Sequence, residues 1–394
     1  MPRHADRVLI AGGGVGGLTA AIALGQRGIE SEVLERSGFI EESGAGIQLG
    51  PNATRALASL GALDAIEAAA FRPEAIAIFD GLTGRRLSSV PLGHAEQRYR
   101  APYVTLHRAD LHAGLYAVAR SLSSVTLKPG FSIDALDAQA TDVVARADDG
   151  AEAKGTALIG ADGLWSTIRP LIMPEASLRF TGHTAWRTLL PRKALPSPFD
   201  APIVGLWLGP RSHLVHYPVR GGDELNIVAV TEGGAALQGW NQPGSSDSLL
   251  ANFARWSKDS KSLLESAPSW RSWSLYSIAD LRAWTSGRVA LLGDAAHPVL
   301  PYLAQGAALA VEDALTLAAC IAAGPDNLSA ALRRYEALRR PRAARIERLS
   351  RSYGRLYHLR GVSRLLRNLL LTRRSEAHAL KRFDWLYGYR GIDA

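Results

Sequence analysis

A glycine turn near the N-terminus constrains the fold more than any other feature of this chain. An apolar run over 7–11 predicts a strand, 15–27 predicts a helix, and between them lies a GxGxxG pattern formed by Gly12, Gly14 and Gly17. In a strand–turn–helix unit such glycines allow a tight turn, the approach of a pyrophosphate to the backbone and close helix–strand packing. Glu35 ends a second predicted strand, where a carboxylate can bind an adenosine ribose. The chain is therefore predicted to bind a dinucleotide, and the fingerprint alone leaves both NAD and FAD open.

Length and composition exclude several classes of protein. With 394 residues, 47% of them apolar, the chain can bury more than one core. The moderate charge content excludes disorder, and the single cysteine, Cys320, excludes a disulfide scaffold and a cysteine-based zinc site, so no metal site is expected. No apolar segment typical of a signal peptide precedes the first strand, and no strongly apolar run of about 18 residues lacks charges and turn residues. We expect a cytoplasmic protein without stable membrane insertion.

The positive charge of the chain is concentrated near its C-terminus. Between Arg333 and Arg382 there are fifteen arginines and one lysine against three glutamates, whereas the whole chain has a formal charge of +8. Such a segment suits nucleic acid or an anionic membrane surface. It equally suits a solvated helical face, because leucines recur among the arginines with an approximately helical period. No DNA-reading motif accompanies the charge, so we expect a solvated helix and no nucleic-acid partner.

Two sequence patterns occur along the chain: alternating strands and helices, and short strands separated by turns. Strands and helices alternate at the start, and a glycine-rich loop over 44–50 leads into a helix that opens at Pro51, with Asn52 expected as its cap. Between 184 and 279, short apolar runs separated by Gly, Pro and Asp predict a mostly antiparallel sheet. The pattern of alternating strand and helix then resumes, with a buried strand predicted over 288–292 and a long helix over 306–323.

Four further motifs follow in order: GAGI at 44–47, HRADL at 107–111, IGADG at 159–163 and LGDAAHP at 292–298. Together with the glycine turn they resemble the class A FAD-dependent aromatic hydroxylases of the p-hydroxybenzoate hydroxylase type. The likeness is closest to the branch of salicylate hydroxylase, 3-hydroxybenzoate 6-hydroxylase and 6-hydroxynicotinate 3-monooxygenase. The motifs extend from residue 7 to about residue 320, which is most of the chain.

The resemblance implies an α/β fold in which a Rossmann-like FAD-binding domain carries an inserted, mostly antiparallel β-sheet substrate domain and a C-terminal helical segment. The expected boundaries place the FAD-binding domain at 1–72, 101–180 and 281–330, the substrate domain at 73–100 and 181–280, and the C-terminal helices at 331–394.

The resemblance also assigns cofactor roles to individual side chains. Asp294 is expected to accept hydrogen bonds from the ribityl hydroxyls, and Arg108 to meet the FAD diphosphate with a guanidinium suited to bidentate contacts. Asp162 is expected either near the flavin or as the cap of a helix starting near Ser166. The helix that opens at Gly306 is expected to stabilise negative charge on the reduced flavin. The full set of expected cofactor contacts is Gly12, Gly14, Val15, Gly17, Glu35, Arg36, Gly46, Ile47, Gln48, Arg108, Asp162, Asp294, Gly306 and Ala307.

The substrate side depends on a predicted strand that contains His213 and Tyr217. Residues 213, 215 and 217 share one face of such a strand, and His216 faces away. The resemblance implies that His213 and Tyr217 contact a substrate hydroxyl and are catalytic; the alternative is an ordinary hydrogen-bonded sheet face. Further substrate contacts are expected at Trp186, Arg187 and Pro301, with Arg187 either a partner of a substrate carboxylate or a structural residue. The resembling hydroxynicotinate enzymes carry a histidine where this chain has Gln48, and the 3-hydroxybenzoate enzymes carry a glutamine where it has Pro301. These two differences leave the substrate open.

The resemblance implies an FAD-dependent monooxygenase that uses NAD(P)H and O2 to hydroxylate an activated aromatic or N-heteroaromatic ring through a flavin C4a-hydroperoxide. Only one dinucleotide fingerprint is present, so NADH or NADPH is expected to bind transiently. The alternatives are a monooxygenase of the same fold with a non-aromatic or polycyclic substrate, and a non-catalytic flavin-binding module. The protein is expected to be a monomer or a homodimer.

Overall fold

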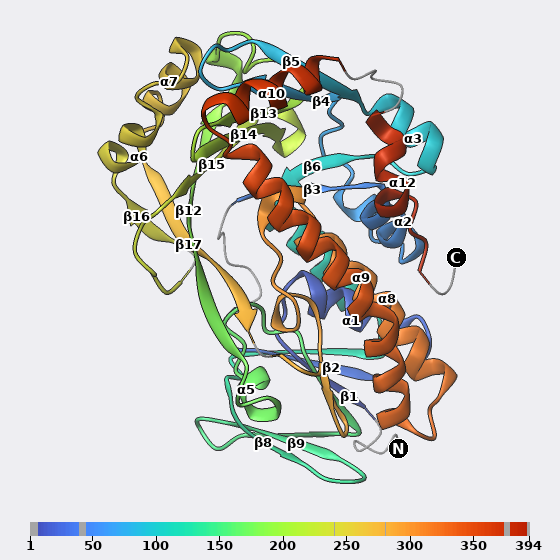
Figure 1. Ribbon diagram of the computed structural model, residues 1–394. Helices are drawn as coiled ribbons and strands as arrows, with labels where there is room; N and C mark the ends of the chain where they lie inside the picture. The colour runs from blue at the N-terminus through green and yellow to red at the C-terminus, as the bar shows by residue number, and fades with distance from the viewer. Residues whose placement is uncertain (1–6, 39–44, 240, 280, 374–378, 392–394) are drawn as a thin grey trace.

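The fold is built around two large β-sheets joined by helices (Figure 1). The computed structural model describes residues 7–38, 45–239, 241–279, 281–373 and 379–391. The first sheet has six strands in the order β18-β19-β11-β1-β2-β7. Its strands are β1 (Val8–Ala11), β2 (Ser31–Glu35), β7 (Val125–Pro129), β11 (Ala157–Gly160), β18 (Thr285–Ser286) and β19 (Val289–Leu291). All of its pairings are parallel except that of β18 with β19.

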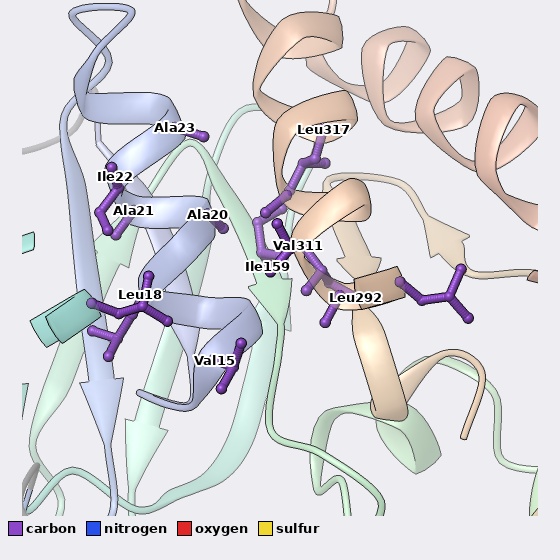
Figure 2. Packing of buried hydrophobic residues seen from close by; sticks show 14 of the residues in the cluster. Val15, Leu18, Ala20, Ala21, Ile22, Ala23, Ile159, Leu292, Val311 and Leu317 are labelled. Atoms are coloured by element: carbon purple, nitrogen blue, oxygen red, sulfur yellow. The ribbon is translucent and has the colours of Figure 1, made fainter. Parts of the chain in front are cut away.

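Buried apolar runs explain why this sheet forms. Every residue of β1, β11 and β19 is buried, as expected for parallel strands covered on both faces. The covering helices are α1 (Val15–Gly25), α4 (Arg108–Ser121) and α8 (Gly306–Ala323). Figure 2 shows the small side chains Ala20 and Ala23 of α1 turned toward Val311 and Leu317 of α8, which lets the two helices approach closely. The start of α8 at Gly306 is where the sequence predicted it.

The second sheet has eight strands in the order β16-β17-β12-β15-β14-β13-β4-β5. Its strands are β4 (Ala75–Asp80), β5 (Arg86–Pro91), β12 (Ser177–Pro191), β13 (Ile203–Gly209), β14 (Ser212–Val219), β15 (Glu224–Glu232), β16 (Gln242–Gly244) and β17 (Trp270–Ala279). Only β4 and β13 pair in parallel, so the expected mostly antiparallel sheet is confirmed.

Each face of the eight-stranded sheet packs against a different pair of helices (Figure 1). On one face, α6 (Ser246–Phe253) and α7 (Lys258–Glu265) cover an aromatic core that includes Trp207 and Trp270. On the other face, Leu206 and Val230 pack with Tyr357 of α9 (Leu328–Tyr357) and with α10 (Gly361–Thr372). We call these two sides the α6–α7 face and the α9 face.

Smaller elements complete the chain, and two of them correct the sequence predictions. The segment Gly46–Leu49 is not a loop: it forms β3, paired with β6 (Val104–His107). A three-stranded sheet contains β8 (Ile133–Ala138), β9 (Val143–Ala147) and β10 (Glu152–Gly155), and the remaining α-helices are α2 (Pro51–Ser59), α3 (Gly93–Tyr99), α5 (Ile168–Ile172) and α12 (Asp384–Tyr387). The cap of α2 is Gly50 rather than Asn52. Asn52 instead donates its side-chain amide to Gln305 and Glu312, so a tertiary contact replaces the expected local one.

The C-terminal segment is helical, as predicted, and it packs through buried charges. Arg339 of α9 is completely buried and pairs with Glu312 and Asp313 of α8 at 2.8 and 2.6 Å. These carboxylates lie inside the one helix of the described chain that is long and apolar enough to cross a membrane, and two thirds of it is buried in the fold. In contrast, α10 exposes its apolar side, including Val362 and Leu365. The C-terminal segment thus exposes part of its apolar side and part of its basic side, and buries the rest.

Candidate active site

Each of the three glycines of the turn, Gly12, Gly14 and Gly17, is required for a different structural reason. Gly12 has a φ of +101°, and a Cβ there would lie 2.7 Å from the carbonyl oxygen of Ala161. A Cβ at Gly17 would lie 1.9 Å from the carbonyl oxygen of Gly12, so this position holds helix and strand together. At Gly14 no other residue that the structure describes, apart from the chain neighbours, has an atom within 4 Å of where a Cβ would be. The space beside Gly14 is therefore open, as a turn that admits a pyrophosphate requires.

Glu35 supports the glycine turn directly. One oxygen of its carboxylate accepts a 2.6 Å hydrogen bond from the amide of Gly13, and the other accepts two from Ser37. Val15 begins α1 and is buried, whereas Arg36 is exposed beside the turn. The imidazole of His112, on α4, lies 2.7 Å from the carbonyl oxygen of Gly13. This contact was missed from the sequence, because nothing in the spacing of α4 relates it to the turn.

Two carboxylates follow the ends of neighbouring parallel strands. Asp162 follows β11, and one oxygen of its carboxylate accepts hydrogen bonds from Thr167 and Ile168 at the start of α5. Of the two roles expected for Asp162, the structure therefore shows the helix cap. Its other oxygen is buried and has no hydrogen-bond partner among the described residues. Asp294 follows β19, is half-buried, and receives no hydrogen bond from the described residues. Burial raises the pKa of Asp294, while His297 and Arg108 oppose this rise.

The N-terminus of α8 faces Asp294. A Cβ at Gly306 would lie 3.9 Å from an oxygen of that carboxylate, and both Gly306 and Ala307 are partly exposed. Arg108 begins α4, its amide donates to the carbonyl of Ala45 at 2.8 Å, and its exposed side chain is close enough to Asp294 to lower its pKa. Across the part of the chain described, no ion pair joins Arg108 to Asp110.

The short strand β3 connects this region to the eight-stranded sheet. The amide of Gly46 donates a 2.7 Å hydrogen bond to the side chain of Asn226, and a Cβ at Gly46 would clash with both Asn226 and Tyr217. Gln48 accepts a 2.7 Å hydrogen bond from the hydroxyl of Tyr103. Ile47, between them, is partly exposed. Glycine at position 46 is thus explained by a close approach of two sheets.

Strand register places three rows of residues across the α9 face. His213, Val230 and Ala185 form the first row; Val215, Val228 and Arg187 form the second; Tyr217, Asn226 and Leu189 form the third. The centre of this arrangement is open, because Val215 and Val228 are half-buried while His213 and Tyr217 on either side are buried. Since β12 and β14 are two strand spacings apart, Arg187 lies about 10 Å from Val215. Apolar residues at the centre with polar residues around them suit a small, flat, partly charged ligand.

His213 is held by aromatic rings at the end of α9. Its Nδ1 lies 2.9 Å from Nε2 of His358, and its ring packs 5.3 Å from that of Tyr302 and 5.4 Å from that of Tyr357. Its Nε2 makes no hydrogen bond to any residue that the structure describes. Burial, followed by the nearby charges of His358 and His183, lowers the pKa of His213 well below its usual value. His213 is therefore neutral at pH 7, with one nitrogen available.

Tyr217 and His216 confirm the expected alternation of this strand. Tyr217 lies on the α9 face, where burial raises its pKa and a hydrogen bond with Gln48 partly opposes the rise. His216 points to the α6–α7 face, with its ring centroid 5.2 Å from that of Phe199. The same alternation corrects one prediction for β12. Trp186 packs into the core of the α6–α7 face and donates to Thr231, so it cannot line a site on the side of His213.

Arg187, next to Trp186, does lie on the α9 face. Its side chain is buried, its guanidinium stacks 5.3 Å from the ring centroid of Trp273, and Nη2 donates to Asn241 at 3.3 Å. Among the residues described, no carboxylate pairs with it. Burial, with the charges of Arg108 and Arg271, lowers the pKa of Arg187 to about 10. Pro301 is exposed at the start of the short helix Pro301–Leu303, in the loop between Asp294 and Gly306.

Comparisons with known proteins agree with this geometry. A family described as "FAD binding domain" matches residues 6–350. This chain belongs to that family of FAD-binding proteins. The 3-hydroxybenzoate 6-hydroxylase of Polaromonas naphthalenivorans is 36% identical over 97% of this chain and 96% of the relative. A 3-amino-4-hydroxybenzoate 2-monooxygenase of Streptomyces platensis is 36% identical over 98% and 96%.

Solved structures share the fold over nearly the whole chain. A salicylate hydroxylase substrate complex has a TM-score of 0.82 at 25% identity and covers 98% of this chain and 96% of the other. Klebsiella pneumoniae HpxO, complexed with FAD and uric acid, has a TM-score of 0.84 at 26% identity and covers 97% and 96%. The resemblance to class A flavin hydroxylases is thereby confirmed, and with it the fold class and the cofactor.

The residues of this FAD-binding family member fit the cofactor. The open space at Gly14 can admit a diphosphate, and the buried free oxygen of Asp162 and the unpaired carboxylate of Asp294 are acceptors for hydroxyl or amide groups. The helix start at Gly306 offers its positive end to an anionic ring edge. These groups converge on the loop that precedes α8, and Tyr302 in the same loop packs against His213. The cofactor side and the α9 face therefore meet at this loop.

Proposed function

We propose that this FAD-dependent monooxygenase hydroxylates an aromatic or N-heteroaromatic ring that carries both a hydroxyl and a carboxylate group. The observation that supports this best is the arrangement on the α9 face, where a partly exposed apolar centre lies between neutral His213, Tyr217 and unpaired Arg187. The relatives act on rings of this kind by name: hydroxybenzoates and amino-hydroxybenzoates. Oxygen and NADH or NADPH complete the set of reactants, and we expect the reaction in the cytoplasm without nucleic-acid partners.

When bound, FAD supplies the transfer of electrons from NAD(P)H and the activation of O2. The side chains of the α9 face then have to orient the ring and increase its electron density. Nε2 of neutral His213 is placed to accept a hydrogen bond or proton from the ring hydroxyl. We expect Tyr217, which lies on the opposite side of Val215, to orient that hydroxyl.

Arg187 is the proposed partner of the carboxylate. A buried guanidinium without an anionic partner is unfavourable, and a bidentate carboxylate removes that penalty. The nearby Arg108 and Arg271 add to the positive potential at this side of the face. A planar acid bound between Arg187 and His213 would have its ring over Val215 and Val228.

A substrate panel tests the proposal. The protein should purify yellow, and NADH oxidation with oxygen uptake should be stimulated by hydroxybenzoates, hydroxynicotinates or aminohydroxybenzoates, with product formed in proportion to NADH. Arg187→Met should raise KM about tenfold or more for carboxylated rings and leave KM for the matching phenol unchanged. If only urate or a polycyclic compound stimulates turnover, the aromatic-acid assignment is wrong. If none of these aromatic acids stimulates turnover, the proposed substrate class is wrong.

A further inference from the structure

We propose that His183, Glu232 and His358 form a binding site for one divalent metal ion of the Zn²⁺ class, beside the α9 face. One donor atom from each of these residues lies within 4.8 Å of the other two. The site is separate from the glycine turn, and its existence does not depend on the proposed function.

The backbone brings two of the donors together by strand pairing. His183 of β12 lies directly opposite Glu232 of β15, and such cross-strand pairs have Cβ atoms about 5 Å apart. The register of β12 against β17 shifts between Phe180 and Thr184, and Gly182 has a φ of +78°. A bulge of this kind re-aims the side chains beside it, here that of His183.

The third donor comes from the end of α9. His358 is the C-cap residue of this helix, and its carbonyl oxygen accepts a 3.2 Å hydrogen bond from the amide of Arg211. This bond ties the helix end to the turn between β13 and β14. Nδ1 of His358 lies 3.5 Å from an oxygen of Glu232 and is buried without a hydrogen-bond partner. A metal ion or a water molecule between this nitrogen and the carboxylate would satisfy both.

His183 presents a lone pair in the tautomer that its backbone contact fixes, and His358 presents one on Nδ1 when its Nε2 carries the proton. Nδ1 of His183 lies 3.1 Å from the carbonyl oxygen of Thr181, to which it can only donate, so its Nε2 carries the lone pair. A backbone carbonyl that fixes the ring in this way is the usual outer contact of a metal-binding histidine.

The donor set determines the class of metal. Two imidazoles and one carboxylate suit Zn²⁺, Ni²⁺ or Cu²⁺, whereas Mg²⁺ and Ca²⁺ prefer oxygen ligands alone. Three protein ligands leave a fourth position for water. Arg211 holds one oxygen of Glu232 at 3.0 Å and leaves the other toward His358. Tyr302, whose ring centroid lies 6.2 Å from that of His183 and 6.1 Å from that of His358, has a buried hydroxyl without a hydrogen-bond partner.

A metal at this site would change the hydrogen bonding of His213, a consequence that rests on the proposed function. With a metal on Nδ1, neutral His358 carries its proton on Nε2 and donates it to Nδ1 of His213. His213 then carries its own proton on Nε2 and can no longer accept one from a ring hydroxyl. Zn²⁺ is therefore expected to inhibit hydroxylation without displacing FAD.

Metal binding can be measured without reference to activity. Holoprotein without a polyhistidine tag, treated with a chelator and dialysed, should bind one Zn²⁺ per chain by calorimetry, and one Co²⁺ with the visible absorption of a nitrogen–oxygen site. His183→Ala and Glu232→Gln should each weaken binding tenfold or more. His94→Ala, at an exposed histidine of α3, is the matched control and should bind as the unaltered protein does. Equal FAD content and equal melting temperature show that the variants are folded.

Two outcomes would overturn these statements separately. Binding that is unaffected in both His183→Ala and Glu232→Gln, or no binding at all, removes the metal site whatever the enzyme hydroxylates. Inhibition of hydroxylation by Zn²⁺ that persists in Glu232→Gln removes the link to His213. Loss of both binding and inhibition in the two variants, with His94→Ala unchanged, supports the proposal in full.

Discussion

The glycine turn and the α9 face differ in how far apart their residues lie in the sequence. The turn uses residues 12–17 and is supported by Glu35 of the next strand, so its parts are close in the chain. The α9 face brings Arg187, His213 and Asn226 together from three strands, and His358 from a helix more than a hundred residues later. The glycine turn is thus specified locally, whereas the α9 face is assembled by tertiary packing. Substitutions in the glycine turn should therefore reduce FAD binding, whereas substitutions on the α9 face should reduce hydroxylation and leave FAD bound.

The largest effect is expected at the glycine turn. Gly14→Val should reduce the FAD content about tenfold or more while the protein stays folded, because the side chain would occupy space that none of the described residues fills. Gly17→Val should instead prevent folding, since its Cβ would overlap the carbonyl of Gly12. Flavin absorbance per chain and circular dichroism distinguish the two. Full flavin content in Gly14→Val would show that the diphosphate lies elsewhere.

The next largest effect is expected at His213. His213→Ala should keep its FAD but slow hydroxylation about a hundredfold, the usual scale for losing a general base. Tyr217→Phe should have a milder effect and raise the share of NADH oxidation that yields hydrogen peroxide, because ring activation is impaired while flavin reduction is not. Product per NADH, with a peroxide assay alongside, measures both. If both variants keep the hydroxylation rate and the product yield per NADH, then His213 and Tyr217 are not involved, and Gln48 is the next candidate to accept the hydrogen bond of the ring hydroxyl.

The pH dependence of stability should report the buried histidines. Burial lowers the pKa values of His216 and His358 to about 3, against about 6.5 in an unfolded chain. Below pH 6.5 the unfolded chain binds protons that the folded protein does not, so stability is lost as the pH falls from about 6.5 toward 3. Each such group contributes about 1.4 kcal/mol per pH unit. Urea unfolding at pH 7, 5.5 and 4.5 should show this slope.

The smallest effect is expected on the other side of the same strand. Within the part of the chain that the structure describes, both ring nitrogens of His216 are buried without hydrogen-bond partners, and its ring lies against Gly205. His216→Leu should raise the free energy of unfolding at pH 7 by about 1 kcal/mol, because it removes unpaired buried polar atoms. It should also reduce the pH slope and leave hydroxylation unchanged. A loss of activity comparable to that of His213→Ala would mean that the two faces are not independent.

The sequence predicted most of what depends on local pattern. The glycine turn, the strand ending at Glu35, the helix starting at Gly306 and the opposite facings of His213 and His216 all follow from short-range rules, and the structure has them. Recognition of the family extended this to the two-sheet fold. The proposed roles of the individual site residues remain predictions.

The features that the sequence did not predict depend on contacts between distant segments. Asn52 has the form of a helix cap, but Gln305 and Glu312 are within reach and the amide binds them instead. Trp186 and Arg187 were expected to line one site, yet neighbours in a strand point to opposite faces. The buried pairing of Arg339 with Glu312 and Asp313 could not be inferred from an arginine-rich helix whose other members are mostly solvated.

The strand order of the six-stranded sheet also determines when the protein can bind its cofactor during synthesis. Strand β1 leaves the ribosome first, but its neighbour β11 follows about 150 residues later and β19 later still. Asp162 and Asp294 extend from those late strands, and α8 comes after both. A nascent chain in which only the glycine turn and its flanking strands have emerged therefore has an incomplete sheet with an exposed edge. Such edges are prone to aggregation, so flavin supply and chaperones should matter most in the final third of translation.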